Sequence, residues 1–187
     1  MVVINRYFWP TKYESRESFL KTGTKCVFIS YQKDDRDAAL KVGEYLEQSG
    51  VGVYIDVYDT DLKFSKQKSN PKEITNLILK GINNSSHMLA IISPNTIQSK
   101  WVPFEIGYGY DKTDLAVLCL RGIPKGSLPE YIRTSPIIRD IYDLNNYIPK
   151  ILGKDKITMI QNKLILEESS FTNPLRNVMD SIVDDRY

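Results

Sequence analysis

The sequence predicts an α/β fold in which helices cover both faces of a parallel sheet. Short apolar runs typical of buried strands alternate along the chain with segments whose apolar residues recur at helical spacing. The strand-like runs also end on polar residues, as the first does at Ser30 and Tyr31. Because the carboxyl ends of parallel strands meet at one edge of a sheet, we expect a functional site at that edge.

Five strands and several helices are expected. In chain order the strands cover residues 26–31, 51–56, 87–92, 115–120 and 137–142. The main helices cover about 35–48, 71–84 and a segment that contains 101–108. Right-handed crossovers then favour the flavodoxin-like strand order 2-1-3-4-5, with a cleft between strands one and three.

The length of 187 residues predicts a single domain with additions at both ends. We expect an N-terminal leader over 1–24 that packs on the domain, the domain itself over 25–145, and a C-terminal helical extension over 146–187. Within the extension, the pattern favours an amphipathic helix over about 174–183.

Composition excludes several classes of protein. Apolar residues make up 42% of the chain and charged residues 26%, as in ordinary globular proteins. Lys and Arg (25) nearly balance Asp and Glu (23), and no basic face is interleaved with aromatics, so we expect no nucleic-acid partner. No apolar run approaches the ~18 residues that span a bilayer, so no membrane partner is expected. Cys26 and Cys119 lie in apolar runs and are expected in the core, and a cytoplasmic location is expected because the chain shows no secretory signal.

Other chemistries find little support in the sequence. The only histidine, His87, opens a buried strand, and no nucleophile motif accompanies it. Cys and His residues show no metal-ligand spacing, so we expect no metal site. Gly107 and Gly109 precede a strand and lack the third glycine of a dinucleotide fingerprint.

Several segments, in order, resemble a TIR domain. Val27-Phe-Ile-Ser-Tyr31 is similar to the first box of that family, and Val53-Tyr-Ile-Asp56 with its following loop is similar to the second strand and BB loop. Ile91-Ile-Ser-Pro94 resembles the end of the third strand. Ser99-Lys-Trp-Val-Pro-Phe-Glu105 is similar to the W-x-x-x-E segment that carries the NAD-cleaving glutamate of enzymatic TIR domains. The resemblance covers about residues 25–145.

The resemblance implies an NAD glycohydrolase or ADP-ribosyl cyclase that uses NAD as its substrate and holds no cofactor. It implies a catalytic role for Glu105, with five substrate-binding candidates at the same edge: Ser30, Tyr31, Asp56, Ser93 and Trp101. ADP-ribose or a cyclic isomer would then act as a signal on a downstream effector, as in the bacterial Thoeris antiphage defence system. The BB loop over 57–70 would mediate a homo-oligomer.

Two other functions stay open at this point. The chain could be a non-enzymatic TIR–TIR interaction module, or an enzyme like the nucleoside deoxyribosyltransferases, which share the sheet topology and use a glutamate nucleophile. Most of the site residues also have a structural interpretation. Glu105 could be favoured by a helix dipole and Trp101 could lie in the core. Asp56 could cap its loop, and Ser30 and Tyr31 could simply end a strand.

Overall fold

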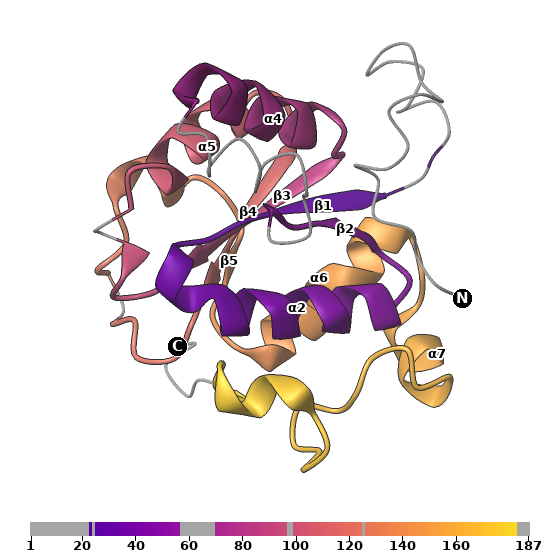
Figure 1. The fold of residues 1–187 in the computed structure, drawn as a ribbon. Coiled ribbons are helices and arrows are strands. Elements are labelled where there is room, and N and C mark those ends of the chain that lie inside the picture. The colour runs from indigo at the N-terminus through magenta and orange to yellow at the C-terminus, as the bar shows by residue number, and fades with distance from the viewer. Residues whose placement is uncertain (1–22, 24, 57–69, 97–98, 125, 183–187) are drawn as a thin grey trace.

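A five-stranded parallel sheet forms the centre of the protein (Figure 1). The structure, a computed structural model, describes residues 23, 25–56, 70–96, 99–124 and 126–182. The strand order is β2-β1-β3-β4-β5, which confirms the flavodoxin-like order expected from the sequence. The strands are β1 (Cys26–Ser30), β2 (Gly52–Tyr54), β3 (His87–Ile92), β4 (Asp114–Cys119) and β5 (Ile137–Ile138).

The central strands are buried on both faces, as the apolar runs predict. All residues of β1 and β3 are buried, and the two strands pair in parallel from Val27 beside His87 to Ser30 beside Ala90. Cys26 and Cys119 are buried thiols in β1 and β4, where the sequence places them in the core.

Helices cover both faces of the sheet. Their bounds are α2 (Arg36–Gln48), α4 (Pro71–Asn83), α5 (Val102–Gly109), α6 (Ile141–Leu152) and α7 (Lys156–Gln161). One apolar core lies between the sheet and α2 and α6, and a second lies between the sheet and α4 and α5 (Figure 1). Within the described residues, short 3-10 helices lie at η2 (Lys33–Asp35), η5 (Glu130–Ile132) and η6 (Pro174–Asn177).

Local signals explain where two of these helices begin and end. The side chain of Asn70 accepts a hydrogen bond from the backbone N–H of Glu73, and Pro71 occupies the first turn of α4. Asp140 caps α6 by accepting from Asp143 N at 2.8 Å, and Gly153 ends that helix with a left-handed φ of 63°. The cap at Asp140 also limits β5, so the expected strand over 137–142 is wrong beyond Ile138.

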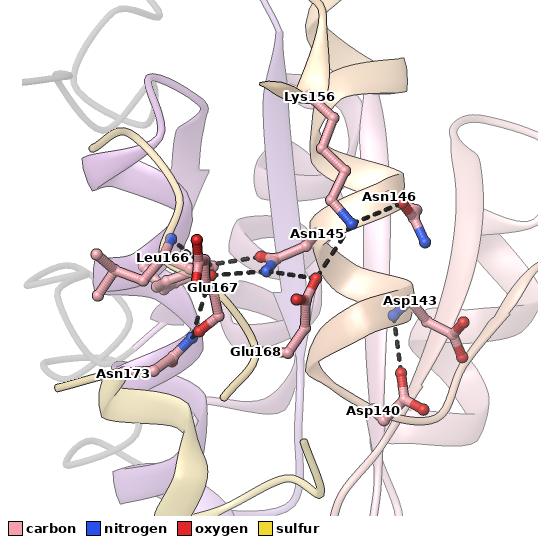
Figure 2. A network of polar contacts seen from close by, with 10 residues as sticks. Asp140, Asp143, Asn145, Asn146, Lys156, Leu166, Glu167, Glu168 and Asn173 are labelled. Carbon is pink, nitrogen blue, oxygen red and sulfur yellow. Dashed lines mark hydrogen bonds and ion pairs between the residues drawn. The ribbon is translucent and has the colours of Figure 1, made fainter. Parts of the chain in front are cut away.

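The C-terminal segment packs on the core beside α2 and α6. Its buried residues Met159, Ile165, Leu175 and Met179 belong to that core. A buried polar network fixes the same segment: Tyr45 Oη donates to Asn145 Oδ1 at 2.7 Å and accepts from Leu166 N at 2.9 Å. Figure 2 shows Asn145 and Lys156 of α6 and α7 contacting Leu166 and Glu168.

The helix expected over 174–183 is wrong beyond its first turn. Only η6 is helical, and the chain then forms an isolated parallel bridge in which Ile141 N donates to Asp180 O at 2.9 Å. Arg121 holds this stretch by donating from Nη2 to Met179 O at 3.0 Å. Val183 lies outside the described residues.

Two expected segments also fall outside the described residues: the leader over 1–24, except for Gly23, and the loop over 57–70, except for Asn70. In the part of the chain that the structure describes, none of the helices combines the length and the apolar character needed to cross a membrane.

Gly81 in α4 tests how tightly the second core is packed. A Cβ at this position would lie 2.6 Å from Cε1 of Tyr54, whose ring is 1% exposed and stacks on Phe28 with centroids 5.2 Å apart. We expect Gly81→Ala to lower the free energy of unfolding by about 1–3 kcal/mol, because the stacked ring must move to admit the methyl group. Urea unfolding measures this loss.

Gly107→Ala is the matched control, since Gly107 is also helical but a Cβ there would meet no atom within 4 Å. We expect this variant to keep its stability or gain up to about 1 kcal/mol from the better helix propensity of alanine. An equal loss in the two variants would contradict the packing argument.

Candidate functional site

Ser30 and Glu105 meet at the carboxyl edge of the sheet. Ser30 ends β1, and its Oγ donates a hydrogen bond to Glu105 Oε2 at 2.5 Å. Ser30 is 1% exposed and Glu105 is 8% exposed. A carboxylate that is so far removed from water is costly unless it is hydrogen-bonded, so the serine both compensates for burial and fixes the orientation of the carboxylate.

The sequence around α5 explains why Glu105 faces inward. Ser99 Oγ accepts from Val102 N at 3.0 Å, which satisfies one of the N–H groups at the start of the helix. The buried residues of α5 are Val102, Glu105, Ile106 and Gly109, which form one helical face. Glu105 therefore stands in the face that packs on the sheet, where an apolar residue would be expected.

Tyr31 and Asp56 form a second pair at the same edge. Tyr31 Oη donates to Asp56 Oδ1 at 2.5 Å. This hydrogen bond joins the residue directly after β1 to a residue shortly after β2. Burial, and next the negative charge of Asp56, raise the pKa of the Tyr31 phenol well above its usual range. The positive charge of Arg36 opposes this rise in pKa, and the charge of Glu105 adds to it.

Ser93 belongs to a third pair, whose partner the sequence analysis missed. Asp35, which is 7% exposed, accepts from Ser93 Oγ at 2.5 Å and from Asn95 Nδ2 at 2.9 Å. Asp35 lies between β1 and α2, and Ser93 follows β3, so the pair joins the two strands that flank the expected cleft. Asp34, Asp35 and Asp37 stand close together in the sequence, and their order does not reveal which one turns inward.

Trp101 lies at the surface, not in the core. Its side chain is 38% exposed at the start of α5, and its ring packs edge-to-face on Phe104, with centroids 5.9 Å apart. The backbone carbonyl of Trp101 accepts from Glu105 N at 2.8 Å, so the exposed ring stands one helical turn before the buried glutamate.

The three pairs share one chemical pattern. In each, a hydroxyl group of a residue at or just after the end of a strand donates to a carboxylate: Ser30 to Glu105, Tyr31 to Asp56 and Ser93 to Asp35. The edge is therefore rich in negative charge and in hydrogen-bond acceptors. Such a surface favours ligands that carry positive charge or present hydroxyl and amino groups.

Comparisons with known proteins show the family and the fold of the chain. Residues 27–144 match the family described as TIR domain. Among solved structures, the TIR domain of a Toll-related receptor from the lower metazoan Hydra magnipapillata superposes with a TM-score of 0.52 at 17% sequence identity, covering 67% of this chain and 96% of that chain. This identity shows a shared fold alone. The curated proteins contain no match to the chain.

The Tyr31–Asp56 hydrogen bond predicts a pH-dependent contribution to stability. We expect Tyr31→Phe to lower the free energy of unfolding by about 1–3 kcal/mol at neutral pH, because Asp56 loses the phenol as a donor. Folding raises the pKa of the Tyr31 phenol. The stabilisation from this group is therefore fully present below the pKa of tyrosine in the unfolded chain, about 10. It is lost as the pH rises from that value toward the pKa in the folded protein. The difference between wild type and variant should therefore shrink above about pH 10.

Urea unfolding at neutral and alkaline pH measures both effects. Tyr131→Phe serves as the control, because the side chain of Tyr131 is 54% exposed and its loss should leave stability unchanged at either pH. A difference between wild type and Tyr31→Phe that stays constant into the alkaline range would contradict the assigned rise in pKa.

Proposed function

The chain belongs to the TIR domain family, and we propose that it is an enzyme that cleaves the bond between nicotinamide and ribose in NAD. The observation that carries this proposal is Glu105, a nearly buried carboxylate held by Ser30 at the carboxyl edge of the sheet. Glu105 lies in the first turn of α5, and its side chain bonds to Ser30 of β1.

The proposed chemistry suits a single carboxylate. The nicotinamide of NAD is a cationic leaving group, so the electron pair of the broken C–N bond neutralises the ring and no general acid is needed. The ribose carbon becomes oxocarbenium-like, and the negative charge of Glu105 stabilises it. Water then attacks this carbon and loses a proton to give ADP-ribose, or a nucleophile within the same molecule attacks and gives a cyclic isomer.

The other residues of the edge would bind the substrate. The Tyr31–Asp56 pair offers an aromatic ring and a carboxylate that can accept from ribose hydroxyls, and the exposed ring of Trp101 offers a surface on which a base or the nicotinamide can stack. The released nucleotide would act in the cytoplasm as a signal for a separate effector, as in bacterial antiphage defence. A homo-oligomer formed through residues 57–70 is part of the same proposal.

A non-enzymatic interaction module is the second candidate. The edge-to-face pair of Trp101 and Phe104 favours it, because these rings are 38% and 40% exposed and lie together at the start of α5. Exposed aromatic residues are frequent at protein interfaces. Chromatography of NAD incubated with the purified protein separates the two candidates, since a module of this kind would leave NAD intact.

Glu105→Gln tests the catalytic assignment. We expect NAD consumption to fall by at least about a hundredfold, because the amide keeps the shape of the side chain but loses the charge that stabilises the oxocarbenium-like centre. The melting temperature should stay within a few degrees of wild type, since the amide oxygen still accepts from Ser30. Nicotinamide release measured by chromatography, together with thermal unfolding, gives both results.

Glu44→Gln is the matched control, because Glu44 is an exposed glutamate of α2 whose charge has no part in the proposed reaction. Turnover near the wild-type rate in Glu105→Gln would rule out the assignment. A large fall in melting temperature with little change in turnover would instead support a structural role for Glu105.

Trp101 is expected to affect substrate binding more than folding. Trp101→Ala should raise the KM for NAD by about two- to tenfold, and Trp101→Phe by less, because stacking needs a ring but tolerates a smaller one. Tyr110→Ala, at the other end of α5 and 53% exposed, controls for the loss of a surface aromatic residue. Equal KM values in wild type and Trp101→Ala would exclude Trp101 from the binding site.

A further inference from the structure

We infer that Asp35 is a positioning residue of this site, which acts through Ser93 and makes the Ser93 hydroxyl a hydrogen-bond acceptor toward the substrate. The inference rests on the proposed function, because it assigns a role in binding the same NAD molecule. It concerns a residue that does not belong to the catalytic pair of Ser30 and Glu105.

The side-chain oxygens of Asp35 bond to a segment outside its own helix. Asp35 precedes α2 directly, yet its side chain makes no capping hydrogen bond to that helix. Its two carboxylate oxygens instead accept from Ser93 and Asn95, which lie 58 and 60 residues further along the chain. A carboxylate that is 7% exposed is costly to bury, and a residue needed only to start a helix could stay in water. The burial of Asp35 is therefore best explained by the segment that it holds.

The segment after β3 is a tight turn that begins at Ser93 and ends at Thr96. Ser93 N donates to Thr96 Oγ1 at 2.8 Å, and Thr96 N donates to Ser93 O at 3.1 Å. Ser93 Oγ in turn accepts from Asn95 N at 3.0 Å. Asp35 accepts hydrogen bonds from the side chains of two residues in this turn, Ser93 and Asn95. These bonds fix the position of the turn and the rotamer of Ser93.

The direction of these hydrogen bonds determines what Ser93 can offer a ligand. A serine hydroxyl has one hydrogen and two lone pairs. The hydrogen is donated to Asp35 and one lone pair accepts from Asn95 N, so within the residues that the structure describes one lone pair remains. Ser93 is thus prepared to accept from a ribose hydroxyl or an amino group of the substrate. It is not prepared to donate to a phosphate oxygen.

A double-mutant cycle on NAD turnover tests this coupling. We expect Asp35→Ala and Ser93→Ala each to raise KM about tenfold with kcat changed less than about twofold, because an oriented hydrogen bond to the substrate is lost while Glu105 is untouched. The double variant should have about the same KM as either single variant, since both changes remove one interaction. Ser93→Thr, which keeps the hydroxyl, should restore most of the affinity.

Asp37→Ala is the matched control, because Asp37 is an exposed aspartate in the first turn of the same helix and its loss reports the helix-dipole effect alone. Should Asp35→Ala fail to fold, Asp35→Asn keeps the shape of the side chain and takes its place in the cycle. A wild-type KM in Asp35→Ala would overturn the inference. So would a double variant whose increase in KM equals the product of the increases caused by Asp35→Ala and Ser93→Ala.

The failure of this inference is distinguishable from failure of the proposed function. An active wild type whose KM does not respond to Asp35 defeats the inference alone. A wild type that leaves NAD intact defeats the proposed function, and the role of Asp35 in binding NAD falls with it.

Discussion

The parallel pairing of β1 with β3 is the constraint on which the site depends. It sets Ser30 beside Ala90, so the chain leaves both strands at the same edge of the sheet. The connection after β1 leads to α2 on one face, whereas the connection after β3 leads to α5 on the other. Asp35 and Glu105 therefore reach the edge from opposite faces, and each finds a serine at the end of a strand.

The sequence was sufficient to predict the sheet order, but the hydrogen bond between Ser30 and Glu105 was not predicted, and the role of Glu105 followed only from the resemblance to a TIR domain. The sheet order follows from a regular feature, namely buried apolar strands that alternate with amphipathic helices, whereas the burial of Glu105 in α5 is seen only in the structure. Asp35 could not be predicted in the same way, because Asp34, Asp35 and Asp37 are alike in type and only the 3-10 turn η2 directs one of them inward. Which of the three aspartates is buried depends on the geometry of this turn, and no periodic pattern of apolar and polar residues predicts it.

The C-terminal segment was predicted less well for a related reason. Apolar residues such as Leu175 and Met179 recur at helical spacing, and that pattern favours a helix. In the structure the same residues are buried in the core, but Arg121 and the bridge to Asp140 satisfy the backbone of the segment in place of helical hydrogen bonds. Tyr45 lies 100 residues from Asn145 and 121 from Leu166, and contacts at such separations are set by the whole fold.

The three carboxylates at the edge also constrain how a dinucleotide would lie there. Glu105, Asp56 and Asp35 attract the cationic nicotinamide and the ribose hydroxyls, but they repel the two phosphates. In the proposed function the nicotinamide riboside half would therefore face the strand ends, and the pyrophosphate would lie further out, toward the exposed basic residues Lys33 of η2 and Arg36 at the start of α2. In the proposed reaction the same charges would act a second time. Once the nicotinamide left as a neutral molecule, the positive charge would reside on the ribose, and the carboxylates that had attracted the cationic ring would stabilise the oxocarbenium-like ribose carbon.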